Sequence, residues 1–264
     1  MDRHTFLRQV HHRLRPRNYF EIGVNDGRSL ALSRVPSIGV DPAFRITREL
    51  RCDVHLVRAT SDDFFARRDP IAHLRGGRNP LRNLRHGRAP FGWYLGRTTL
   101  DLSFIDGMHL FEYALRDFMN VERLAGTSSV IILDDVFPRS VDEAARDRHT
   151  TAWAGDVYKI IAVLRKHRPD LVVLPMDTTP TGVLVVLGAD ARNRRLRSAY
   201  DRLVAQQLRP DPQDVPVEII ERHGAIDPVR FFESPLLDEV RSSRRFGRRR
   251  LDRVRATAAE LASP

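Results

Sequence analysis

The stretch NYFEIGVNDGRSLAL, residues 18–32, joins an apolar run to a turn that carries glycines at positions 23 and 27. Glycine adopts backbone conformations that other residues avoid, and it lets a ligand approach the main chain closely. The helix expected after the turn presents unpaired N–H groups to an electron-rich group. The stretch therefore predicts a buried first strand that ends at a nucleotide-type binding site.

Six more short apolar runs follow the first, with helical stretches between them. Short, almost continuously apolar runs are typical of strands buried on both faces, and their alternation with helices predicts a parallel, doubly wound sheet. The connection at residues 177–182, DTTPTG, is too short for a crossover helix, so the seventh run should return antiparallel to the sixth. The expected fold is α/β, a Rossmann-like doubly wound sheet of seven strands with the last one antiparallel. The runs occupy residues 19–24, 37–41, 54–59, 100–106, 129–135, 170–175 and 182–188.

The helical stretches show the spacing of amphipathic helices. Residues 2–15 carry Phe6, Val10 and Leu14 on one face, with Asp2 as the N-cap. Further helices are expected at residues 106–124, 155–169 and 191–208. The expected organisation is one domain at residues 1–190 with a basic insert at 66–98 that is a candidate lid, followed by a helical, arginine-rich C-terminal extension at 191–264.

Composition limits the class of protein. The chain has 264 residues, of which 42% are apolar, and its single cysteine, Cys52, rules out an intrachain disulfide and a cysteine-based zinc cage. No run approaches the eighteen apolar residues of a membrane span, and the first residues do not resemble a signal peptide. A cytoplasmic protein without a membrane partner is expected.

The net charge of +10 is confined to two segments. Residues 66–98 carry eight arginines against one acid, and residues 241–264 carry eight against two, so the rest of the chain is slightly acidic. Only two of the 44 basic residues are lysines, a skew that base composition explains better than selection for phosphate contacts. Nucleic acid is therefore not favoured as a partner, and the question of a homo-oligomer stays open.

Acidic residues stand at the ends of the predicted strands. In an open α/β sheet, ligands bind outside the carboxyl ends of the strands. Asp41, at the end of the second run, suits the ribose hydroxyls of an adenosine group, although it also suits the cap of a helix beginning at Pro42. The acids at strand ends are Asp41, Asp62, Asp63, Asp106, Asp134 and Asp135.

The first turn lacks the G-x-G-x-x-G fingerprint of dinucleotide sites and shows Glu21-x-Gly23-x-x-x-Gly27 instead. This motif, an acid ending the second strand, an acid after the third and an antiparallel seventh strand together resemble the class I S-adenosylmethionine-dependent methyltransferases. The resemblance covers about residues 18–188. It implies that Gly23 to Gly27 pass under the methionine part of the cofactor.

The same resemblance assigns the remaining cofactor contacts. Glu21 would orient the loop, and Ser29 or Arg28 would meet the methionine carboxylate. Asp41 would bind the ribose, with the adenine at Ser61 and Asp62. The implied cofactor-binding residues are Glu21, Gly23, Asn25, Gly27, Ser29, Asp41, Ser61, Asp62 and Asp106.

Three carboxylates, from Asp106, Asp134 and Asp135, follow the fourth and fifth strands with no neighbouring lysine or arginine in the sequence. Like charges so close repel each other unless a cation or shared protons compensate, and Mg²⁺ prefers such hard oxygens. The arrangement is similar to that of metal-dependent O-methyltransferases acting on catechols and on sugars of macrolide and aminocoumarin antibiotics. Alternatively, Asp134 or Asp135 caps a turn before Pro138, and Asp106 binds the amino group of the cofactor.

Asp106 and His109 form a D-G-x-H motif that resembles a set of bacterial methyltransferases, and they are the candidate catalytic residues, with His109 as base or acceptor ligand. Trp153 suits either an acceptor pocket or, more simply, core packing. Asp156 is expected to cap its own helix, and Lys159 to lie on that helix's surface.

The sequence thus predicts an S-adenosylmethionine-dependent methyltransferase that methylates a hydroxyl of a small-molecule acceptor, assisted by Mg²⁺. A metal-free small-molecule methyltransferase and a non-catalytic Rossmann-like binding module with a basic tail are the alternatives. An NAD-dependent enzyme ranks lower because the pyrophosphate fingerprint is absent.

Overall fold

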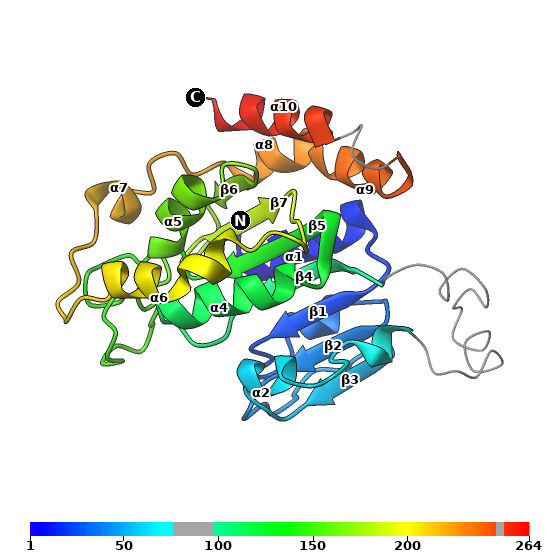
Figure 1. Cartoon of the computed structure of the whole chain (residues 1–264), viewed down its shortest axis with the longest axis horizontal. Helices are drawn as coiled ribbons and strands as arrows, with labels where there is room; N and C mark the ends of the chain where they lie inside the picture. Colours follow the sequence, from blue (N-terminus) through cyan, green and yellow to red (C-terminus); the bar gives the residue numbers. More distant parts are fainter. Residues whose placement is uncertain (76–97, 247–250, 264) are drawn as a thin grey trace.

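A computed structural model describes residues 1–75, 98–246 and 251–263 of the chain. Its centre is a seven-stranded sheet with the order β3-β2-β1-β4-β5-β7-β6 (Figure 1). The sequence prediction of seven strands is confirmed. The strands are β1 (Tyr19–Ile22), β2 (Ser37–Val40), β3 (Val54–Val57), β4 (Leu100–Ile105), β5 (Ala125–Asp134), β6 (Val172–Met176) and β7 (Val183–Leu187).

The sheet is parallel except for β7, which runs antiparallel to both β5 and β6. The predicted antiparallel return is therefore confirmed. The chain runs outward from β1 through β2 to β3 and then continues on the other side of β1 with β4, so strand order reverses between β1 and β4. Ligands of doubly wound sheets bind at such a reversal.

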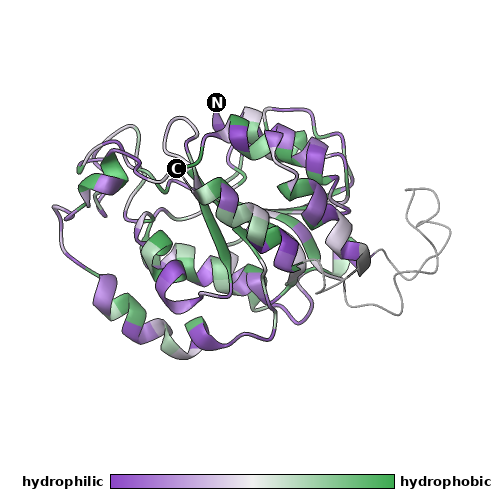
Figure 2. Cartoon of the chain, turned by 90° about the horizontal axis from the view of Figure 1, so that it is seen from above, coloured by the Kyte–Doolittle hydropathy of each residue, from purple (hydrophilic) through white to green (hydrophobic). Residues whose placement is uncertain are grey.

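Helices cover both faces of the sheet and enclose two apolar cores (Figures 1 and 2). Each face is buried because the strands other than the edge strand β3 are largely apolar on both sides. On one face lie α2 (Ser61–Phe65), η2 (Ala72–Arg75), α4 (Phe111–Glu122), α5 (Lys159–His167) and α6 (Arg195–Gln207). On the other lie α1 (Arg3–Leu14), η1 (Leu30–Leu32), α8 (Pro228–Glu233), α9 (Leu236–Phe246) and α10 (Leu251–Ala262), while α7 (Val217–Ile220) is a single short turn.

Residues beyond 190 take part in both cores. Helix α6 packs on α4 and α5, whereas α9 packs on α1 and β5, and α10 packs on α9 and β6. Residues 76–97, most of the segment expected to be an inserted lid, lie outside the described residues. Among the helices that the structure describes, none is both long and apolar enough to cross a bilayer.

Two helix predictions near the first turn are wrong. The turn is followed only by the three-residue 3₁₀ helix η1, and residues 42–53 form no helix, so Asp41 caps none. Residues 42–53 instead form backbone hydrogen bonds with the glycine turn after β1. Arg45 N–H donates to Asn25 O at 2.8 Å, and Thr47 N–H donates to Asp26 O at 3.0 Å. Backbone donors used in this way are not available for helical hydrogen bonds.

Candidate active site

A cavity of about 730 Å³ opens at the carboxyl ends of the strands, where strand order reverses. Of the residues singled out from the sequence, those that line it are Gly23, Asn25, Asp41, Ser61, Asp62, Asp106, His109, Asp135 and Trp153. Glu21, Gly27, Ser29 and Asp134 are not among its lining residues. The remaining wall includes Arg3, Arg148 and Thr181, which no motif in the sequence marked as functional.

Gly23 lets the ends of β1 and β4 meet at the floor of the cavity. Its φ is +84°, and a Cβ at this position would lie 1.7 Å from the carbonyl oxygen of Asp106. Only glycine tolerates both the conformation and the contact. The predicted close approach at Gly23 thus involves the neighbouring strand's own backbone, while its cavity side stays open to a ligand.

Asp41 tethers the end of β2 to the glycine turn. Its carboxylate accepts hydrogen bonds from Asn25 N–H at 2.8 Å and from Ala43 N–H at 2.6 Å. A carboxylate that accepts backbone N–H groups is held in a fixed orientation. Asp41 therefore shapes the turn as well as lining the cavity.

Glu21 lies behind the cavity wall and is fully buried. Burial raises the pKa of Glu21 to about 8, against the opposing effect of hydrogen bonds from Tyr19 and Ser29. The Tyr19 hydroxyl donates to Glu21 Oε2 at 2.6 Å. The raised pKa favours the protonated form of Glu21 at neutral pH.

Ser61 and Asp62, the first two residues of helix α2, line the part of the cavity that lies beside β3. Asp62 pairs with Arg116 at 2.6 Å. Behind them, burial raises the pKa of Asp117 to about 7, although a hydrogen bond with Ser61 lowers it. Asp117 also lines the cavity, so this end presents a weakly acidic wall that the sequence did not reveal.

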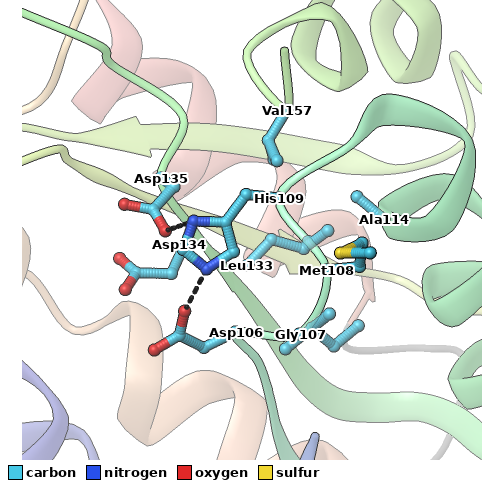
Figure 3. A pocket seen from close by; sticks show the side chains of 10 residues that line it. Asp106, Gly107, Met108, His109, Ala114, Leu133, Asp134, Asp135 and Val157 are labelled. Atoms are coloured by element: carbon cyan, nitrogen blue, oxygen red, sulfur yellow. Dashed lines mark ion pairs between the residues drawn. The ribbon is translucent and has the colours of Figure 1, made fainter. Parts of the chain in front are cut away.

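At the other end of the cavity, Asp106, His109 and Asp135 converge (Figure 3). His109 Nε2 lies 3.3 Å from Asp106 Oδ1, and His109 Nδ1 lies 3.1 Å from Asp135 Oδ2. Asp135 has a φ of +61°, an uncommon value for a residue other than glycine, directly after β5 ends. The Thr181 hydroxyl donates to Asp135 Oδ1 at 2.6 Å.

The neighbouring carboxylates favour the charged form of the His109 imidazole. Burial lowers the pKa of His109, but the hydrogen bond to Asp106 and the charges of Asp135 and Asp106 outweigh it, so the pKa rises to about 9. The His109 imidazole thus bridges the carboxylates of Asp106 and Asp135, two of the three that the sequence predicted to lie together.

Asp134 does not join this group. Its side chain is only 2% exposed, and its carboxylate forms an ion pair with Arg3 of α1. Arg3 Nη1 also lies 3.3 Å from Asp106 Oδ2. The residues whose ligand atoms all lie within 4.8 Å of one another are Asp106, His109 and Asp135, so Asp106, Asp134 and Asp135 do not form the predicted set.

Trp153 lines the cavity and is only partly buried, which favours the pocket wall over core packing. Its ring stacks on His109 with centroids 5.1 Å apart, and its Nε1–H donates to Ala145 O at 2.6 Å. Gly155 brings this loop against the D-G-x-H turn: its φ is +59°, and a Cβ there would lie 1.6 Å from His109 O.

Asp156 and Lys159 also differ from expectation. Asp156 Oδ1 accepts Phe111 N–H at 2.7 Å, so it caps α4 instead of its own helix. Its Oδ2 accepts hydrogen bonds from Arg146 and from Lys159, each at 2.8 Å, and Lys159 is buried. This buried network fixes the loop that carries Trp153 to the helix that follows His109.

A divalent ion fits Asp106, His109 and Asp135 by ligand type and spacing. Two carboxylates with one imidazole suit ions such as Mn²⁺, Fe²⁺ or Zn²⁺ better than Mg²⁺, which prefers oxygen ligands alone. The ion would have to displace the proton of His109 and share Asp106 with Arg3.

No family model and no curated protein matches the chain. Among solved structures, the chain is similar to an O-methyltransferase from Bacillus cereus in complex with S-adenosylhomocysteine, at 16% identity and a TM-score of 0.42 over 70% of this chain and 80% of that one. It is also similar to the O-methyltransferase TomG from Streptomyces achromogenes, involved in tomaymycin synthesis and bound to S-adenosylmethionine, at 15% identity and a TM-score of 0.43 over 71% and 79% of the two chains. At these identities and TM-scores, the likenesses do not assign an activity to this chain.

Proposed function

We propose that the chain is a methyltransferase that moves the methyl group of S-adenosylmethionine to a hydroxyl of a small-molecule acceptor. The observation that carries the proposal is one continuous cavity that joins the glycine turn and Asp41 to the cluster of Asp106, His109 and Asp135. The reversal of strand order and the antiparallel β7 agree with the class I methyltransferase fold that the sequence motifs resemble.

The cofactor would lie along the strand ends. Its ribose would meet Asp41, its adenine would lie near Ser61 and Asp62, and its methionine part would cross Gly23. A sulfonium and an ammonium are cations, so a cavity lined by several carboxylates complements them.

The reaction is an in-line displacement at the methyl carbon. It requires the acceptor oxygen about 3 Å from that carbon, and holding the two together supplies much of the rate enhancement. Asp106 lines the cavity with a side chain 18% exposed, so its carboxylate is accessible to an acceptor hydroxyl and would accept its proton. His109, whose Nε2 lies 3.3 Å from Asp106 Oδ1, would position that carboxylate.

Trp153 stacks on His109, and Arg148 lies over the Trp153 ring, so both side chains would face the acceptor. The aromatic wall excludes water from the acceptor and favours a flat, partly apolar molecule. A divalent ion held by Asp106, His109 and Asp135 would act as a Lewis acid that lowers the pKa of the acceptor hydroxyl.

Isothermal titration of the purified protein with S-adenosylhomocysteine, and separately with NAD, tests the cofactor class. One-to-one binding of S-adenosylhomocysteine at micromolar concentration, with no heat from NAD, is expected. The reaction is then tested by following S-adenosylhomocysteine release from S-adenosylmethionine with a panel of catechols and sugars. Absence of S-adenosylhomocysteine binding, together with salt-sensitive binding of DNA or RNA, would contradict the proposal and support a non-catalytic binding module instead.

A further inference from the structure

Arg3, on helix α1, places a positive charge beside the cluster of Asp106, His109 and Asp135, although it is distant from these residues in the sequence. It pairs with Asp134, at the end of β5, and with Asp106, which follows β4. Its side chain is 25% exposed and lines the same cavity as His109. Arg3 is therefore in contact with the cluster and also within reach of whatever enters the cavity.

The position of Arg3 is fixed by the hairpin that joins β6 to β7. Arg3 N–H donates to Thr179 O at 3.1 Å, and Thr179 N–H donates to Met1 O at 2.9 Å. The same hairpin supplies Thr181, whose hydroxyl bonds to Asp135. One hairpin thus holds both the arginine and one of the carboxylates of the cluster.

The cluster and the neighbouring Asp134 already have most of their counter-charge within the fold. Three carboxylates, from Asp106, Asp134 and Asp135, face the guanidinium of Arg3 and the imidazole of His109. A divalent ion at Asp106, His109 and Asp135 would meet the positive charge of Arg3 on a shared ligand, Asp106. Like charges at such distances in a partly buried site oppose each other strongly.

We propose that Arg3 is a resident counter-cation that competes with divalent metal for the Asp106 carboxylate and so keeps the metal affinity of the cluster low. The proposal rests on the function proposed above only in placing this cluster in the active site, because the competition itself is a property of the apoprotein. The cluster then works without bound metal unless the ion is abundant, and the residue that decides this lies on α1, outside the strand-end motifs.

A purely structural ion pair looks different elsewhere in this chain. Arg17 gives three hydrogen bonds to the single carboxylate of Asp101, from its backbone N–H, its Nε and its Nη2, each at 2.8 Å. Arg3 instead divides its contacts between acids of two strands and faces the cavity. An arginine shared in this way leaves Asp106 able to exchange partners.

Titration of the cofactor-free protein with Mn²⁺, followed by the loss of the free-ion signal in electron paramagnetic resonance, tests the competition. Arg3→Gln should bind one Mn²⁺ at least about ten times more tightly than the wild type, the ratio that a 1.4 kcal/mol change in binding free energy gives. Arg8→Gln is the matched control, because Arg8 is an exposed arginine on the same helix and does not line the cavity. It should bind as the wild type does.

Removing Arg3 leaves Asp134 buried without its partner, which is costly for stability. The double variant Arg3→Gln/Asp134→Asn removes both charges and serves if the single variant does not fold. Adding Asp135→Asn to the tighter-binding variant should abolish the gain in Mn²⁺ affinity. That loss would show that the ion binds at the cluster.

Equal Mn²⁺ affinity in the wild type and in the folded Arg3 variants would overturn the proposal, and so would a gain that survives Asp135→Asn. S-adenosylhomocysteine binding, measured separately in chelator, reports on the proposed function alone. A protein that fails to bind S-adenosylhomocysteine but shows the Arg3-dependent change in Mn²⁺ affinity would refute the function and support the competition.

Discussion

The imidazole of His109 lies flat against the indole of Trp153, with ring centroids 5.1 Å apart and ring planes 10° apart. The backbone carbonyl of Trp153 also lies 2.6 Å from His109 Nδ1, and the indole is fixed by its hydrogen bond to Ala145 O. A loop that follows β5 thus fixes the orientation of a histidine that follows β4. The candidate active site depends on this loop as much as on the strand ends.

Replacing Trp153 should therefore slow the reaction without weakening cofactor binding. Trp153→Ala removes the stacking surface, and a catalytic group displaced by about 1 Å costs roughly 10²-fold in rate. We expect kcat/KM for the acceptor to fall by about that factor, with S-adenosylhomocysteine affinity unchanged in calorimetry. Trp153→Phe keeps an aromatic face and should lose much less. Equal activity of the Ala and Phe variants would show that stacking does not position His109.

Gly155 and Gly224 offer a matched pair for testing the contact between this loop and His109. Both have positive φ, +59° and +72°, but a Cβ on Gly224 meets nothing within 4 Å, whereas one on Gly155 would lie 1.6 Å from His109 O. Gly224→Ala should cost about 1 kcal/mol through backbone strain alone. Gly155→Ala should cost several times as much in urea unfolding and should also lower activity. Similar losses of stability in the two variants would mean that the loop carrying Gly155 can move away from His109 at no further cost in stability.

Asp41 is expected to control cofactor affinity. Asp41→Ala removes the acceptor of two backbone N–H groups, from Asn25 and Ala43, and the proposed ribose contact. Hydrogen bonds to a charged group contribute about 1.5–3 kcal/mol, so S-adenosylhomocysteine binding should weaken about 10- to 100-fold in calorimetry. Glu49→Ala is the control, because Glu49 is an exposed carboxylate that pairs with Arg51 and does not line the cavity. An Asp41→Ala protein with wild-type affinity would remove Asp41 from the site.

The raised pKa of Glu21 predicts how the stability of the protein depends on pH. Burial raises its pKa from 4.5 to about 8, so the folded protein retains a proton that the unfolded chain releases. Its contribution to stability is therefore complete below about pH 4.5 and is lost as pH rises through about 8. Glu21→Gln keeps a side-chain carbonyl that accepts from Tyr19 and cannot ionise. The melting temperature of the variant should fall less between pH 6 and pH 9 than that of the wild type, and parallel curves would contradict the prediction.

The C-terminal helices show where the sequence was informative only in part. Their helical character was predicted, but their place on the second face of the sheet, against α1, β5 and β6, was not. The spacing of apolar residues specifies a helix and the side that it buries. It does not specify which distant surface that side meets.

The sequence by itself determined the seven strands, the antiparallel return of the last one and the glycine turn that ends β1. These features follow from contacts among near neighbours in the chain: apolar runs, a connection too short for a helix, and a conformation that only glycine tolerates. The sequence also placed Asp106, His109 and Asp135 at strand ends, so their meeting in one cavity followed from the parallel order of β4 and β5.

Only the tertiary structure decided how the charges at this cavity are paired. Arg3 and Asp106 are 103 residues apart, and no spacing rule connects them. The hairpin between β6 and β7 brings Arg3 to Asp134 and Thr181 to Asp135, and the loop after β5 brings Trp153 to His109. Such pairings depend on which elements become neighbours in the sheet, and for carboxylates this determines whether a metal ion, an arginine or a histidine supplies the compensating charge.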